Sequence, residues 1–329
     1  MKHANIAVFV PHSGCPQQCS FCNQRTISGK TAKPSAQEVV SACETAMAGG
    51  CKDSFTQLAF FGGSFTAIDR AYMLSLLQAA QPYIENGFLN GGIRISTRPD
   101  FIDEEILALL SRYGVRAIEL GAQSMDEVVL SLNKRGHTAQ DVEEASKLIK
   151  SHGFELGLQM MTGLYGSTPQ KDIRTAKRII DLQPDTVRIY PTVVLKNTML
   201  GELFKSGEYK PQSLDETVAL CAELMQMFEE KNINIIRLGL HAEKGIEENY
   251  LAGAYHPALR ELCQGEIYYK KILDLLEKKP KGNYEIIVPA KDVSKAPGQK
   301  KKNISRLAEC GYNCKVVAGD ETKIIIRGR

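Results

Sequence analysis

The sequence lacks the features that would place it in a membrane, secretory or repeat-protein class. No apolar run reaches the about eighteen residues that a membrane-spanning helix needs, so we expect no membrane association. The N-terminus has neither the apolar segment nor the cleavage site of a signal peptide, and no short internal repeat indicates a solenoid. Nine cysteines without a secretory signal indicate reduced thiols rather than disulfides, so we expect a cytoplasmic protein.

Charge is distributed unevenly along the chain. The 329 residues carry a formal net charge of +3, yet residues 278–329 carry +8 and residues 1–277 therefore carry about −5. The run Lys278–Gly282 indicates a linker at the point where the net charge of the chain changes sign. We predict a core over residues 1–277 and a small basic α+β module over residues 278–329. Such a module can neutralise nucleic-acid phosphates, and a solvated basic face or a disordered tail is the alternative.

Apolar segments of strand length alternate with helical patterns through the core. The predicted strands are Ile6–Val10, Gln57–Phe61, Gly92–Ser96, Val115–Leu120, Glu155–Met161, Asp185–Tyr190 and Ile233–Leu240. The predicted helices are Ala71–Tyr83, Asp103–Tyr113, Ala139–Ser151, Pro169–Leu182 and one that begins at Ser213, after a long loop through Pro211. This alternation implies a parallel sheet with right-handed crossovers. The predicted fold is α/β, a partial (β/α)6 TIM-like barrel with a lateral element and a small basic C-terminal α+β extension.

The basic module contains short apolar or alternating segments. We expect Lys315–Val317 and Lys323–Arg327 to form a hairpin around Gly319 and Asp320. Cys310 and Cys314 also fall here, and no third cysteine lies near them. Buried apolar thiols are therefore a better explanation than a second metal site.

Three cysteines stand close together after the first predicted strand. Cys15, Cys19 and Cys22 form a C-x3-C-x2-C motif. Three thiolates on one loop can hold three corners of a 4Fe-4S cube and leave the fourth iron open, whereas most iron–sulfur carriers use four cysteines. An open iron can bind S-adenosylmethionine (SAM) and pass it one electron, and cleavage of the sulfonium then gives a 5′-deoxyadenosyl radical. We expect Phe21, beside Cys22, to shield the cluster.

Zinc is the alternative occupant of this motif, because zinc binds cysteines at similarly short spacing. A zinc site would need a fourth cysteine or a histidine, and His12 is close in sequence. The position of the motif favours the cluster, since β/α folds place their chemistry after the C-terminal ends of strands.

A second motif follows the second predicted strand. The segment Phe60–Thr66 reads Phe-Phe-Gly-Gly-Ser-Phe-Thr, and its glycines permit a close approach of the backbone to a ligand. Together the two motifs resemble the radical SAM superfamily. The Gly-Gly-Ser-Phe form is similar to the radical domain of the elongator catalytic subunit and its relatives. The similarity extends over about residues 4–275 and includes Ser96–Asp100, Glu119–Ser124, Lys134–Thr138 and Arg188–Thr192.

The resemblance implies metal ligands and a SAM site. The three cysteines would hold the 4Fe-4S cluster. The candidate SAM-binding residues follow the second, third and fourth strands and are Gly62, Gly63, Ser64, Thr97, Arg98, Gln123 and Ser124. Arg98 offers a planar bidentate donor for a carboxylate, and a salt bridge to Asp100 is its alternative role. Met160–Gly166 is expected near adenine.

Substrate-facing candidates follow the later strands. We single out Tyr190, Lys196 and His137 as catalytic candidates, which could hold a phosphate or carboxylate or donate a proton or hydrogen atom. An exposed charge or a hydrogen-bonded loop residue is the alternative for each. Further cationic groups in the same regions are Lys134, Arg135 and His241.

The elongator relatives modify the wobble uridine of tRNA and also carry an acetyltransferase domain, for which the last roughly fifty residues here are too few. We therefore predict a radical SAM enzyme that modifies RNA, in particular a tRNA base, with an electron donor such as flavodoxin or ferredoxin. One alternative is a radical enzyme on a small-molecule or porphyrin-like substrate, in the manner of oxygen-independent coproporphyrinogen oxidase. Another is a non-catalytic metal-binding or RNA-binding protein.

Overall fold

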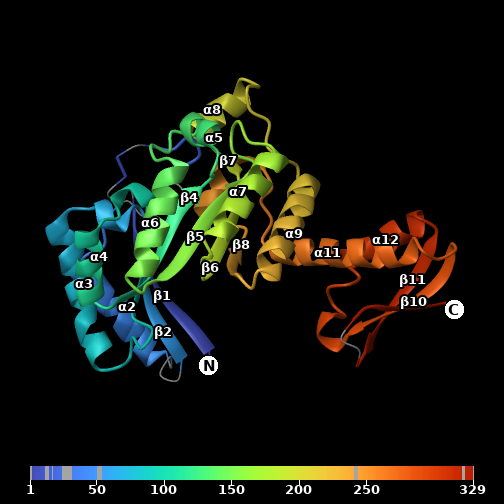
Figure 1. Cartoon of the computed structure of the whole chain (residues 1–329), viewed down its shortest axis with the longest axis horizontal. Helices are drawn as coiled ribbons and strands as arrows, with labels where there is room; N and C mark the ends of the chain where they lie inside the picture. The colour runs from blue at the N-terminus through green and yellow to red at the C-terminus, as the bar shows by residue number, and fades with distance from the viewer. Residues whose placement is uncertain are drawn as a thin grey trace.

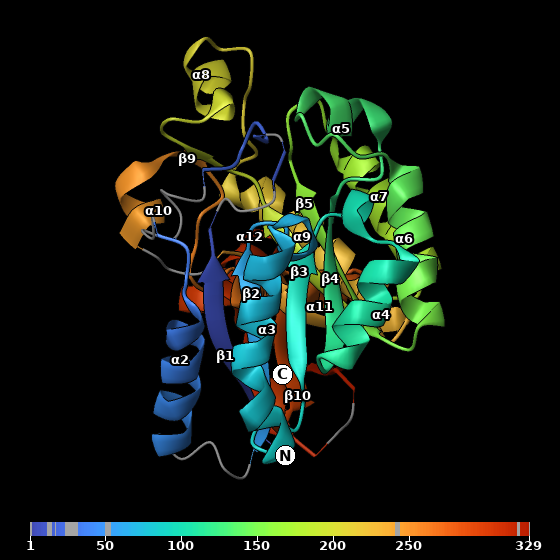
Figure 2. The same cartoon turned by 90° about the vertical axis from the view of Figure 1, so that its left-hand side faces the viewer.

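A seven-stranded parallel sheet dominates the computed structural model, which describes residues 2–11, 15–16, 18–23, 32–49, 54–240, 244–320 and 323–328. The strand order is β1-β2-β3-β4-β5-β6-β8. The strands are β1 (Lys2–Val10), β2 (Ser54–Gly62), β3 (Ile93–Thr97), β4 (Val115–Gln123), β5 (Glu155–Thr162), β6 (Thr186–Pro191) and β8 (Asn234–Leu238). The sheet curls into a half-barrel with helices on its outer side (Figures 1 and 2). The predicted partial barrel is confirmed.

Most of the helices begin at a residue whose side chain accepts from a backbone N–H of the first turn. Ser35, Thr138 and Ser213 each form a capping box, in which the N-cap side chain accepts from the backbone N–H of the third helical residue and the side chain of that residue accepts from the N-cap backbone N–H. The helices are α2 (Ala36–Ala48), α3 (Arg70–Glu85), α4 (Glu104–Arg112), α5 (Glu127–Leu132), α6 (Ala139–Ser151), α7 (Pro169–Asp181), α8 (Met199–Lys205), α9 (Leu214–Glu230), α10 (Lys244–Asn249), α11 (Leu259–Leu276) and α12 (Lys302–Glu309). None of the helices in the described ranges is long and apolar enough to cross a membrane.

The two faces of the half-barrel differ in chemistry because side chains alternate along each strand. The outer face is apolar and packs against the helices to form the main core, with Leu58, Ile118 and Leu158 among its fully buried members. The inner face carries polar and charged side chains. At its centre Glu119, 1% exposed, accepts hydrogen bonds from Arg188 at 2.6 and 2.9 Å.

The same carboxylate accepts from two more inner-face side chains, Arg94 at 3.4 Å and Gln159 at 2.9 Å. Arg94 also reaches Glu155, at 2.7 Å. Arg94, Arg188, Glu119 and Glu155 are therefore joined in one network of ion pairs on the inner face, below the C-terminal ends of the strands.

The segment after β6 differs from the prediction of a long loop through Pro211. It contains β7 (Val193–Leu195) and α8, and β7 pairs antiparallel with β9 (Tyr250–Gly253). Thr198 caps α8, since its hydroxyl accepts from the Gly201 N–H at 3.0 Å. The prediction was wrong because a three-residue strand has no periodicity to detect, and its partner lies far along the chain.

The basic C-terminal region forms a second, three-stranded sheet beyond the end of α11 (Figure 1). Its strand order is β11-β10-β12, built from β10 (Gly282–Pro289), β11 (Tyr312–Gly319) and β12 (Ile325–Gly328). The expected hairpin between the last two strands is therefore wrong. The more apolar β10, with Ile286 and Val288 fully buried, takes the centre and separates them.

This region has its own core, which includes the end of α11. Ile286, Leu307 and Tyr312 are packed with Ile272 and Leu276 of that helix. The segment is thus folded rather than a tail without structure. The division at residue 277 stays a prediction.

Candidate active site

A cavity of about 240 Å³ lies at the C-terminal ends of the half-barrel strands. Its wall combines the cysteine loop with the ends of β2, β3, β4 and β6. The predicted site residues that line it are Cys15, Cys19, Cys22, Gly62, Gly63, Ser64, Thr97, Arg98, Gln123 and Tyr190. Residues from distant parts of the sequence therefore meet in one place.

All three cysteines of the motif line this cavity. The Cys22 N–H donates to the Cys19 carbonyl at 3.1 Å, which closes a turn between them. The Cys15 Sγ lies 3.7 Å from the Ser64 hydroxyl. Within the described ranges, no three His, Cys, Asp or Glu side chains converge on one point to hold a single ion. A cubane cluster binds each thiolate at a different iron, so three cysteines can hold it without converging on one point. His12, the candidate fourth zinc ligand, lies outside the described residues.

Glycine is required at the turn that ends β2. Gly62 has φ +114°, and a Cβ atom there would lie 2.8 Å from the Val10 carbonyl oxygen and 3.0 Å from the Phe9 ring. The Gly63 N–H donates to the same Val10 carbonyl at 2.8 Å. The turn therefore lies directly against β1, beside the cysteine loop that follows it.

Two arginines beside the cavity have different partners. Arg98 forms a bidentate salt bridge with Asp100, at 2.9 and 2.7 Å, which is the alternative role named for it above. Arg135 is 6% exposed and donates to Cys19 Sγ at 3.1 Å and to the Gly121 carbonyl at 2.6 Å. Its Nε is buried without a hydrogen-bond partner, and no carboxylate pairs with it among the described residues. A buried cation of this kind requires an anion, which the thiolates of a cluster or a ligand carboxylate would supply.

Gln123 has a strained backbone at the end of β4. Its φ is +63°, and the pairing with β5 shifts register between Gly121 and this residue. Its side-chain Oε1 is buried and lacks a hydrogen-bond partner within the part of the chain described. Strain and an unsatisfied acceptor in a cavity wall mark a position held for a ligand. Gln123 thus offers an acceptor and Arg135 a positive charge, which together fit a cofactor that carries both a hydrogen-bond donor and an anionic group.

Three predicted residues do not line the cavity. Ser124 is buried behind it, with its hydroxyl 3.3 Å from that of Thr175. His137 lies behind the β4 end with Nε2 3.2 Å from the Ala122 carbonyl, and burial followed by the charge of Arg135 lowers its pKa to about 4. Lys196 donates to the Glu248 carbonyl at 3.0 Å in an exposed contact. His241 lies outside the described residues.

Tyr190 of β6 also lines the cavity. Burial raises the pKa of its phenol, and the neighbouring Arg188 belongs to the Glu119 network. Gln159 and Met161 of β5 also line the cavity; Met161 belongs to the stretch Met160–Gly166 expected near adenine, whereas the sequence analysis did not select Gln159. The sequence signal for both residues is their position, because alternate side chains at the end of a strand point to the inner face of the sheet. In the C-terminal module, burial raises the pKa of Cys314 to about 11, and Cys310 packs against the module core.

Comparison with known families gives two matches that together span most of the chain. A model described as the Radical SAM superfamily matches residues 9–179. A model described as the Radical_SAM C-terminal domain matches residues 184–269. The first covers both sequence motifs and more than half of the chain.

Curated relatives point in the same direction. The tRNA uridine(34) acetyltransferase of Dehalococcoides mccartyi (strain CBDB1) is 26% identical over 253 residues, which cover 67% of this chain and 55% of that protein. Elongator complex protein 3 of Homo sapiens is 36% identical over 139 residues, which cover 41% of this chain and 25% of that protein. The chain thus spans about half, or less, of the length of these relatives.

Solved structures share the fold. An archaeal Elp3 from Methanocaldococcus infernus with an N-terminal deletion aligns with a TM-score of 0.62 at 23% identity, over 82% of this chain and 67% of that one. Coproporphyrinogen III oxidase (HemN) from Escherichia coli, a radical SAM enzyme, aligns with a TM-score of 0.50 at 19% identity, over 70% and 53%. At these identities the likeness shows a common half-barrel.

Proposed function

The chain belongs to the radical SAM superfamily, whose enzymes use a 4Fe-4S cluster and SAM, and from this premise we propose that it modifies a base in tRNA. The family match confirms the resemblance inferred from the two motifs. The observation that carries the proposal is that Cys15, Cys19 and Cys22 line the same cavity as the Gly62–Gly63 turn and Tyr190. The tRNA substrate is supported by the names of the relatives, which include tRNA uridine(34) acetyltransferase, and by the basic module. A cytoplasmic location is part of the proposal.

The residues around the cavity have separable roles in this proposal. Cys15, Cys19 and Cys22 would hold the cluster, which supplies the electron that cleaves SAM to a 5′-deoxyadenosyl radical. Arg135 places a buried positive charge beside these thiols, and its hydrogen bond to the Gly121 carbonyl orients the guanidinium. The unsatisfied Oε1 of Gln123 can accept a hydrogen bond from an amino or hydroxyl group of SAM.

Two further residues of the cavity suit a substrate. Burial raises the pKa of Tyr190 further above its ordinary value of 10.0, so its phenol is protonated at neutral pH and can donate a hydrogen bond or a hydrogen atom. Gln159 adds an amide to the lining, and its Nε2 donates to Glu119 at 2.9 Å. A planar, hydrogen-bonding nucleobase matches such a wall better than a simple aliphatic compound does.

The C-terminal module offers charges for the rest of a tRNA. Lys295, Lys302 and Arg306 are already paired with Asp292, Asp215 and Glu266. Lys300 and Lys301, before α12, form no ion pair with any residue that the structure describes. Exposed lysines of this kind bind phosphates through a salt-dependent, sequence-independent attraction.

An anaerobic assay tests the function. The protein is reconstituted with iron and sulfide, reduced and supplied with SAM, and 5′-deoxyadenosine is measured with and without bulk tRNA. We expect product that depends on Cys19 and that tRNA increases at least several-fold, with loss of product in Cys19→Ala. Stimulation by a small-metabolite pool and not by tRNA would refute the tRNA substrate. Absence of 5′-deoxyadenosine under strong reductants would refute the radical chemistry.

A further inference from the structure

The cysteine loop is attached to the barrel by one fully buried serine. Ser20, directly after Cys19, has no exposed surface, and neither does Asn133. The Ser20 hydroxyl donates to Asn133 Oδ1 at 2.6 Å, and its N–H donates to the Asn133 carbonyl at 3.1 Å. The Ser20 carbonyl accepts from the Leu200 N–H, on α8, at 2.8 Å. Every polar group of this residue therefore bonds to a distant part of the chain.

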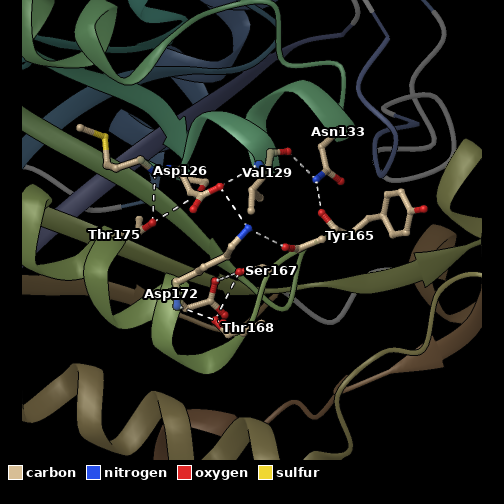
Figure 3. Close-up of polar contacts among 12 residues, drawn as sticks. Asp126, Val129, Asn133, Tyr165, Ser167, Thr168, Asp172 and Thr175 are labelled. Carbon is tan, nitrogen blue, oxygen red and sulfur yellow. Dashed lines mark hydrogen bonds and ion pairs between the residues drawn. The ribbon is translucent and has the colours of Figure 1, made fainter.

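Asn133 joins the cysteine loop to two other segments. It follows the last residue of α5, and its Nδ2 donates to the Val129 carbonyl at 2.8 Å and to the Tyr165 carbonyl at 2.9 Å. Figure 3 shows this side chain between the end of α5 and the loop that follows β5. One amide thus fixes three loops at the C-terminal ends of the strands.

Phe21 adds an apolar attachment next to the polar one. Its ring packs with Val194, Leu200 and Tyr209, a cluster formed by β7, α8 and the loop before α9. Ser20 and Phe21 are the residues between Cys19 and Cys22. Fixing these two residues fixes where both cysteines stand.

We propose that Ser20 and Asn133 are positioning residues that hold the cysteine loop in its cluster-binding shape before the cluster is inserted. Preordering the loop reduces the conformational entropy that binding would otherwise remove. A hydrogen bond between two groups without solvent contact is also strengthened by the low local dielectric. The proposal rests on the cluster of the proposed function and not on its tRNA substrate.

The first test measures how firmly the cluster is held. The variants are Ser20→Ala, Asn133→Ala and the double variant, and the control is Ser146→Ala, a serine with 1% exposure whose buried hydroxyl has no partner among the described residues. We expect a chelator to remove iron about tenfold faster from Ser20→Ala, the size of effect that follows from losing one partner of a buried hydrogen bond. The double variant should add little to Asn133→Ala, because the two residues share one interaction. The midpoint potential of the cluster should also shift, which a general loss of stability would not cause.

The second test uses the iron-free chain. Hydrogen exchange followed by mass spectrometry reports on residues 18–23 and 199–205, where the Ser20 and Leu200 amides lie. We expect these amides to be protected in the wild type and to exchange about tenfold faster in Ser20→Ala. Unprotected amides in the iron-free wild type, or equal iron loss in Ser20→Ala and Ser146→Ala, would overturn the proposal. Neither test contains tRNA, so a wrong substrate leaves both results interpretable, and Ser20→Ala suffices if Asn133→Ala does not fold.

Discussion

Replacing Glu119 by glutamine removes the charge at the centre of the inner face of the half-barrel. Arg94 keeps a second carboxylate, Glu155 at 2.7 Å, whereas Arg188 keeps none among the residues that the structure describes. The Arg188 side chain is 12% exposed, so the variant leaves one largely buried guanidinium unpaired. Breaking a buried ion pair on one side costs about 3–5 kcal/mol, and we expect the free energy of unfolding to fall by that amount.

Urea denaturation followed by circular dichroism measures this loss. The matched control is Glu105→Gln, which makes the same chemical change in an Arg70–Glu105 pair whose side chains are 48% and 83% exposed. Its effect should stay within about 0.5 kcal/mol, because surface ion pairs contribute little. Adding Arg188→Met to Glu119→Gln should recover part of the loss, since it removes the unpaired charge. If Glu119→Gln costs no more than the control, the inner-face charges do not stabilise the barrel as argued.

Three further predictions use single features of the site and the module. Gly62→Ala should abolish cluster retention and lower the thermal midpoint of unfolding more than the control Gly87→Ala does. Both glycines have positive φ, but of the two only Gly62 has a backbone atom within 2.8 Å of the new Cβ. Equal shifts of the midpoint in the two variants would contradict the steric argument. For His137, the pKa is lowered in the folded state to about 4 from 6.5, so the unfolded chain binds more protons between these values and stability falls as the pH drops through this window. In urea titrations, the free energy of unfolding of the wild type should fall by about 3 kcal/mol between pH 7 and pH 4 relative to that of His137→Gln. Parallel curves for the two proteins would refute the lowered pKa of His137. Replacing Lys300 and Lys301 by glutamate should reduce the slope of log Kd for tRNA against log salt by roughly 1.5, and an unchanged slope would remove the α12 end from the RNA contact.

The sequence predicted the half-barrel well because each strand carries its own signal. Alternation along β4 and β5 places Ile118 and Leu158 outward and Glu119 and Gln159 inward, and this period of two is readable without any tertiary information. The motif residues were found for a similar reason. Parallel strands end on the same side of a sheet, so the cysteines and the Gly62 turn had to meet.

The parts that the sequence could not predict depend on choices between partners. Both Arg98 and Arg135 could have paired with a carboxylate. The Asp100 side chain pairs with Arg98, so Arg135 is the one left without such a partner among the described residues. Ser20 carries no signal of its own in the sequence, because its partner Asn133 is more than a hundred positions away. Strand order in the small sheet failed as a prediction for the same physical reason, since β10 competes with β12 for β11 and wins by burying more apolar surface.

The basic module folds back along the helix that leads to it. The 18 residues of α11 make a helix about 27 Å long that runs from the barrel to the module (Figure 1). The start of α12 returns to the first half of this helix, where Asn303 donates to the Gly265 carbonyl at 2.8 Å, and Lys302 pairs with Asp215 in the first turn of α9 at 2.7 Å. Lys300 and Lys301 therefore stand next to a helix of the barrel. Under the proposed function, an RNA bound to these lysines would contact the barrel and the module as one continuous surface.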